Sequence, residues 1–162
     1  MNIIYKIISN FINNKSLYIG EKVTMSDHMI QSAMIAERKK SSKSLICACL
    51  LHDYGHFILE DPDELVRKKL DGKHEEIGYE YLSKFFNEDV VGPIKYHVKA
   101  KRYLSRERKY YSLLSKDLKH SLTGIAKSGL EQYDHCYNWP YDFFSIVELI
   151  KVDSKVDFSS RE

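Results

Sequence analysis

An adjacent histidine and aspartate, His52-Asp53, directly follow an apolar run that extends from Leu45 to Leu51. A run of this kind belongs in a protein interior, so the fold must place an imidazole and a carboxylate beside its core. Burying such groups costs several kcal/mol unless something pairs with them. A divalent metal ion suits both, because histidine supplies a neutral nitrogen and the two oxygens of an aspartate can bridge two metals. The pair therefore points to a buried metal site.

The segments around this pair have helical rather than strand periodicity. Apolar residues at 3, 4, 7, 8, 11 and 12 have the spacing of an amphipathic helix. Capping residues and breakers predict further helices after 24–27, from Ser42 or Ser44 to about Tyr54, from Asp61, and over 75–86, 95–104, 110–127 and 141–155. Alternating patterns typical of strands are scarce. We therefore expect an all-α compact helical bundle, with one domain over residues 1–162.

The composition excludes several classes of partner. The 162 residues carry a net charge of only +2, which argues against a nucleic acid or a membrane surface as partner. The longest apolar runs are well short of the ~20 residues that a membrane-spanning helix needs. Three cysteines, Cys47, Cys49 and Cys136, show no disulfide spacing, and the N-terminus lacks the pattern of a signal peptide. We expect a protein of the reducing cytoplasm, with a monomer as the simplest oligomeric state.

The His-Asp pair belongs to an ordered set of candidate ligands. In chain order these are His28, His52, Asp53, His74, His97 and Asp153. Four histidines and two aspartates suffice for two metals, with Asp53 as the bridge. One metal would take His28, His52 and Asp153, and the other would take His74 and His97. Mixed nitrogen and oxygen ligands suit iron or manganese and do not exclude zinc.

Two further side chains are placed by helical spacing. His56 lies four residues after His52, so it falls on the same helix face if that helix continues. Lys101 has the same relation to His97. Both residues are therefore candidates for the neighbourhood of the metals.

Longer strings around these positions carry a family resemblance. They are Tyr18-Ile19-Gly20-Glu21, Leu51-His52-Asp53-Tyr54-Gly55-His56, Gly72-Lys73-His74-Glu75 and His97-Val98-Lys99-Ala100-Lys101-Arg102-Tyr103-Leu104. The set resembles the HD-domain superfamily. Within it, the chain is similar to the mixed-valence diiron oxygenases that cleave the carbon–phosphorus bond of 1-hydroxyphosphonates, which are relatives of the myo-inositol oxygenases. The resemblance extends from about Lys15 to Lys155.

The resemblance implies an activity and roles for individual residues. Two iron ions would be held by the six candidate ligands, with O2 as co-substrate. His56, Lys101 and Ser121 would bind the phosphonate oxygens of a small-molecule substrate, which needs cations and N–H donors nearby. Tyr18 would occupy an iron position in the resting site. Glu21 would face a substrate amino group or move with Tyr18.

Several positions depart from the family pattern and leave alternatives open. Leu118 stands where relatives have a serine, and the string around Asp153 is reduced, so Asp157 is an alternative last ligand. The candidate substrates are 2-amino-1-hydroxyethylphosphonate, which would give glycine, and hydroxymethylphosphonate, which would give formate. Two other functions remain: a metal-dependent phosphohydrolase on the same scaffold, and a catalytically inactive helical regulatory module.

Overall fold

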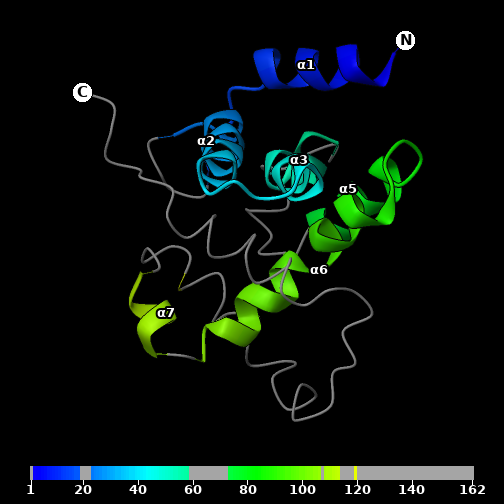
Figure 1. The fold of residues 1–162 in the computed structure, drawn as a ribbon. Coiled ribbons are helices and arrows are strands. Elements are labelled where there is room, and N and C mark those ends of the chain that lie inside the picture. Colours follow the sequence, from blue (N-terminus) through cyan, green and yellow to red (C-terminus); the bar gives the residue numbers. More distant parts are fainter. Residues whose placement is uncertain (1, 19–22, 59–72, 107, 114–118, 120–162) are drawn as a thin grey trace.

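The computed structural model describes residues 2–18, 23–58, 73–106, 108–113 and 119 of the chain. Its elements are α1 (Ile3–Asn13), α2 (Met25–Arg38), α3 (Lys43–Leu51), the short 3-10 helix η1 (Tyr54–Phe57), α5 (His74–Leu82), α6 (Glu88–Leu104) and α7 (Arg108–Leu113) (Figure 1). Within these ranges the one β-type pairing is an isolated bridge between Leu17 and Thr24. The all-α prediction is therefore confirmed.

Side-chain caps explain where the first helices begin. Thr24 accepts a hydrogen bond from the backbone N–H of Asp27, and the Asp27 carboxylate reaches back to the Thr24 backbone, which makes a capping box at the start of α2. At the start of α3 the Ser42 hydroxyl accepts a hydrogen bond from the backbone N–H of Leu45. The sequence predicted the first start, and it left the second open between Ser42 and Ser44. The helices expected from Asp61 and over 141–155 lie outside the described residues.

The third helix is shorter than its sequence pattern predicted. It ends at Leu51, with His52 as its C-cap, and the chain then forms η1 from Tyr54. The sequence predicted that His56 would share a helix face with His52 if the helix continued. Because the helix ends at Leu51, the two residues do not share one. Asp53, between the two helices, has φ −102° and ψ 11°, the sparsely populated region where many active-site residues lie. The break turns the Asp53 side chain out of the helical repeat.

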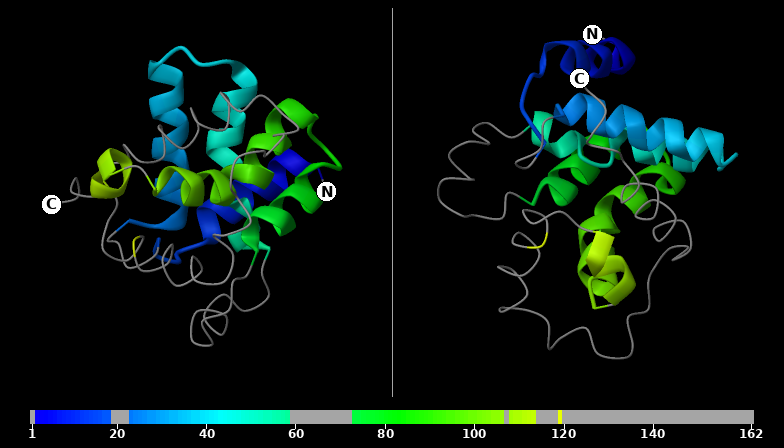
Figure 2. Two further views of the ribbon diagram at one scale, coloured as in Figure 1. Left: turned by 90° about the horizontal axis from the view of Figure 1, so that it is seen from below. Right: turned by 90° about the vertical axis from the view of Figure 1, so that its left-hand side faces the viewer.

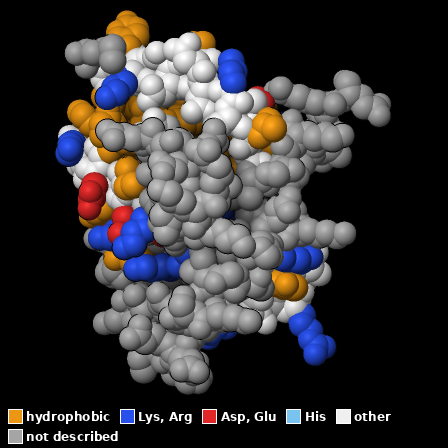
Figure 3. Space-filling model, turned by 180° about the vertical axis from the view of Figure 1, so that it is seen from behind, with side chains coloured by type: hydrophobic (Ala, Val, Ile, Leu, Met, Phe, Trp, Pro, Cys, Tyr) orange, Lys and Arg blue, Asp and Glu red, His pale blue; other side chains and the backbone are white. Residues whose placement is uncertain are grey.

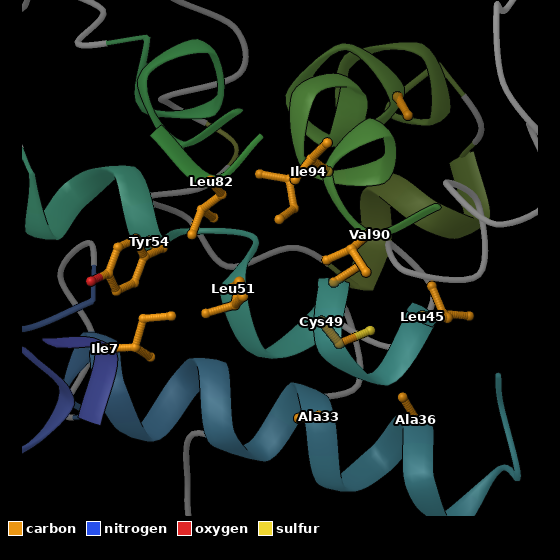
Figure 4. Packing of buried hydrophobic residues seen from close by; sticks show 13 residues of the cluster. Ile7, Ala33, Ala36, Leu45, Cys49, Leu51, Tyr54, Leu82, Val90 and Ile94 are labelled. Atoms are coloured by element: carbon orange, nitrogen blue, oxygen red, sulfur yellow. The ribbon is translucent and has the colours of Figure 1, made fainter. Parts of the chain in front are cut away.

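The hydrophobic core joins α1, α2, α3, η1, α5 and α6 (Figure 4). The helices α2 and α3 lie side by side, α6 packs on both α3 and α5, and η1 packs on α5 (Figures 1 and 2). The labelled core residues in Figure 4 include Ile7, Ala33, Leu51, Leu82 and Ile94. These described helices share one core, while the single domain over 1–162 stays a prediction.

The first helix is attached to this core mainly along one side. Of its apolar residues only Ile7 is buried, and Asn10 donates a hydrogen bond of 2.8 Å to the Tyr54 hydroxyl of η1. The other side of the helix exposes three isoleucines to solvent, Ile4, Ile8 and Ile12. Figure 3 shows hydrophobic side chains on the upper part of the back face, with Lys and Arg side chains both among them and below them. Within the described residues, no helix is both long and apolar enough to pass through a membrane.

A pair of glycines allows η1 to lie directly against α5. A Cβ atom added to Gly55 would lie 1.9 Å from the backbone oxygen of His74, so no other residue fits without backbone movement. A Cβ on Gly78 would lie 3.2 Å from the backbone nitrogen of Gly55, which is tight but tolerable. This backbone contact fixes the distance between the segment that carries Asp53 and the start of α5.

We predict that Gly55→Ala lowers the free energy of unfolding by about 2 kcal/mol or more, because the added methyl group must push η1 away from α5. Gly78→Ala is the matched comparison. It should change stability little, because its milder contact is offset by a gain in helix propensity of up to ~1 kcal/mol. Urea denaturation of the three proteins measures this. Equal stability of wild type and Gly55→Ala would contradict the account.

Candidate metal centre

Five candidate ligands from four segments meet in the interior. His28 lies in α2, His52 caps the end of α3, Asp53 links α3 to η1, His74 begins α5, and His97 lies in α6. Four of them are buried, and His74 has 17% of its side chain exposed. The crossing helices therefore bring together residues separated by up to 69 positions in the chain (97 − 28).

The Asp53 carboxylate divides the four histidines into two pairs. Its Oδ2 lies 3.2 Å from Nε2 of His52 and 3.6 Å from Nε2 of His28. Its Oδ1 lies 3.2 Å from Nε2 of His74 and 3.2 Å from Nε2 of His97. Within each pair the two Nε2 atoms are 3.2 Å apart. The arrangement forms two groups of three potential ligand atoms that share one aspartate.

Backbone carbonyls fix the orientation of two of the rings. His52 Nδ1 lies 2.8 Å from the carbonyl oxygen of Cys49, and His97 Nδ1 lies 2.6 Å from that of Ile94. In both cases the acceptor is the carbonyl three residues earlier in the helix. Nδ1 must carry the proton to donate these bonds, so in the neutral rings Nε2 presents a lone pair to Asp53.

The ionisation of these groups follows from burial. Burial lowers the pKa of His97 to about 4, and the charge of Lys101 acts in the same direction. For Asp53, burial alone would raise the pKa, but the neighbouring imidazoles, His52 first and then His74 and His97, hold it well below its usual value. At neutral pH the centre therefore contains an anionic carboxylate beside a neutral His97.

These donors fit metal ions. A neutral His97 with its proton on Nδ1 places a bare nitrogen 3.2 Å from a carboxylate oxygen, so two lone pairs face each other unless a cation lies between them. Ligand atoms about 2.1 Å from a common metal, at angles of about 90–110°, lie about 3–3.4 Å apart. Most of the separations around Asp53 fall in that range. The described residues could hold one metal on each side of the carboxylate.

Three predicted residues flank the two groups. The Tyr18 ring stacks on His28 with centroids 3.7 Å apart and is 2% exposed. The His56 ring stacks on His74 at 4.1 Å. Lys101, 8% exposed, lies one turn after His97 in α6. Tyr18 thus lies beside the His28 side of the centre, and His56 and Lys101 lie beside the His74 and His97 side.

The structure thus brings five of the six predicted ligands into one cluster, and their role as metal ligands stays a prediction. Glu21, Ser121, Asp153 and its alternative Asp157 lie outside the described residues. Sequence reasoning gave no role to Glu75, which is buried beside His74, and did not foresee the close backbone contact at Gly55. A carboxylate next to a candidate ligand at a helix start was the available signal for Glu75.

A pH dependence follows from the buried imidazoles. Burial and the neighbouring His74 lower the pKa of His56 to about 3, and His97 titrates near pH 4. Unfolded histidines titrate near 6.5. Between these values the unfolded chain binds more protons than the folded one. We therefore predict that the metal-free protein loses unfolding free energy as the pH falls from 6.5 to 4.

Urea denaturation of metal-free protein across this range measures the effect, with His56→Gln as the comparison. The variant lacks one of the titrating groups, so its stability should fall less steeply with acidification. Stability that stays constant between pH 6.5 and 4, or a slope that His56→Gln leaves unchanged, would contradict this description of the centre.

Comparison with known proteins identifies the family. The model of the HD domain family matches residues 25–121. A 1-hydroxy-2-(trimethylamino)ethylphosphonate dioxygenase of Leisingera caerulea, which forms glycine betaine, is 42% identical over 106 residues, covering 65% of this chain and 54% of its own length. A hydroxymethylphosphonate dioxygenase of Gimesia maris is 39% identical over 101 residues, with 61% and 50% covered. An uncharacterised protein of Acanthamoeba polyphaga mimivirus is 40% identical over 98 residues.

The chain spans about half the length of these curated relatives. The family match extends over more than half of the chain and includes the five clustered residues on α2, α3, α5 and α6. The arrangement of these residues around one buried aspartate and the match lead to the same conclusion: the chain belongs to the HD domain family.

Proposed function

We propose that this chain is a diiron oxygenase that uses O2 to cleave the carbon–phosphorus bond of a small 1-hydroxyphosphonate. The observation that carries the proposal is the buried carboxylate of Asp53, with one histidine pair at each of its oxygens. Two relatives named as phosphonate dioxygenases support the substrate class. The balanced reaction converts one hydroxyphosphonate and one O2 into one carboxylic acid and one phosphate, as the C1–H and C1–P bonds break.

The proposed ligand sets are those expected from the sequence. His28, His52 and Asp153 would hold one iron, His74 and His97 the other, and Asp53 would bridge them. Bound in a mixed-valence state, the irons would supply the redox chemistry of O2 activation. The protein would contribute binding, orientation and exclusion of water from a centre that is almost wholly buried.

Substrate would bind on the side of His74, the most exposed of the five clustered residues. His56 stacks on this ring, and Lys101 carries its charge close to His97. A phosphonate placed here would meet an ammonium group and an imidazole N–H, which suit its anionic oxygens. Ser121 would add a hydroxyl group. On the opposite side, Tyr18 covers His28 and would have to move for a ligand to reach the first iron.

The direct test is phosphate release from iron-loaded protein, with and without O2. Separate reactions would contain 2-amino-1-hydroxyethylphosphonate, hydroxymethylphosphonate and the trimethylamino substrate named for the Leisingera relative. We expect phosphate only in the presence of O2, together with the matching acid. Phosphate release from a phosphate ester without O2 would instead indicate a phosphohydrolase. No turnover of any compound by the iron-loaded chain would favour the inactive regulatory module.

We predict that Lys101→Met weakens phosphonate binding while both metals stay bound. A charge-assisted hydrogen bond contributes about 1.5–3 kcal/mol, so the KM should rise on the order of 10–100-fold. Lys99→Met is the matched control, because Lys99 lies in the same helix with its ammonium 5.5 Å from the Tyr96 ring. Steady-state kinetics and iron content measure the two effects. A loss of iron in Lys101→Met would contradict the assignment.

A further inference from the structure

Three of the clustered histidines, His52, His74 and His97, need a hydrogen-bond acceptor for the ring nitrogen that faces away from Asp53, and two kinds of acceptor lie near them. A histidine that binds a metal through Nε2 needs an acceptor for its Nδ1–H, which fixes the ring and raises its basicity. His52 and His97 use the carbonyl three residues earlier in their own helices. His74 is the first residue of α5, so that helix has no residue three positions before it. Its ring requires an acceptor of another kind.

The neighbouring carboxylate is placed to supply it. Glu75 Oε2 lies 3.6 Å from His74 Nδ1, and the residue is only 4% exposed. Within the part of the chain that the structure describes, this oxygen has no hydrogen-bond partner. Glu75 lies in the first turn of α5, where the positive end of the helix dipole favours a carboxylate. A buried anion with an unsatisfied oxygen is costly unless it serves a nearby donor or cation.

We infer that Glu75 is a positioning residue that accepts the Nδ1–H of His74 and so sets the second metal position. His74 Nε2 faces Asp53, while Nδ1 faces Glu75, so the glutamate acts through the ring and not on the metal itself. His56 holds the same ring from its face. The carboxylate would also increase the electron donation of His74 and offset part of the metal charge. The inference rests on the two-metal site of the proposed function.

The test compares Glu75→Leu and Glu75→Gln with Glu76→Leu in the 162-residue chain. Glu76 is the matched control, because it is the next residue in α5, has 45% of its side chain exposed, and pairs with Lys73 at 3.2 Å. Metal-free proteins are titrated with Fe²⁺ under anaerobic conditions and with Co²⁺, and the number of bound ions and both dissociation constants are measured. Glutamine keeps an acceptor oxygen without the charge, whereas leucine removes both.

We expect wild type and Glu76→Leu to bind two ions. In Glu75→Leu the weaker site should lose affinity on the order of 10–100-fold, as second-shell substitutions do, and Glu75→Gln should lose less. Retention of one ion with wild-type affinity would show that the Glu75→Leu chain is folded. Two ions bound with wild-type affinity by Glu75→Leu would overturn the role of Glu75 alone. Fewer than two ions in wild type would overturn the two-metal site itself, and the role of Glu75 with it.

A second readout separates positioning from a general structural role. In the metal-free protein, Glu75→Leu removes a buried carboxylate, so its unfolding free energy should equal or exceed that of wild type. In the presence of saturating metal, the same variant should gain less stability than wild type does. A loss of stability in the metal-free variant that equals the loss in the metal-bound one would show that Glu75 only supports the fold.

Discussion

The carboxylate of Asp53 is the group on which the rest of the site depends. It is buried, it is held in its anionic form, and each of its oxygens faces two imidazole nitrogens. Such a group is unfavourable in a protein interior unless cations or donors surround it. The four helices that contact it each contribute a histidine to that purpose. The same packing therefore has two tasks. It buries a hydrophobic core between α2, α3, α5 and α6, and it surrounds a charged centre beside that core.

Helix ends provide much of this geometry. His52 caps α3, Asp53 lies in the break before η1, and His74 begins α5. Residues at such positions leave the regular helical repeat, so their side chains can converge from different directions. The direct backbone contact at Gly55 sets how closely two of these ends approach. The clustered side chains are thus held by a rigid arrangement of helix ends, as a site that needs precise distances requires.

Helix starts and the candidate ligands could be predicted from the sequence, because local rules govern both. Thr24 and Ser42 cap helices through their own side chains. His52-Asp53 was recognisable because it interrupts an apolar run. The end of α3 was not predictable in this way, because the first residue type that breaks helices after Leu51 is Gly55, whereas the actual break accompanies the packing of η1 against α5. For Glu75 the sequence offered only its place beside His74 at a helix start, because its burial arises from tertiary contacts that no local pattern reports.

We propose that Asp53 bridges two metal ions, one at each oxygen. The most direct measurement is anomalous X-ray diffraction at the iron edge from crystals of the iron-loaded protein. The account predicts two anomalous peaks on opposite sides of the Asp53 carboxylate, one beside His28 and His52 and the other beside His74 and His97. A single peak, or peaks remote from Asp53, would contradict it.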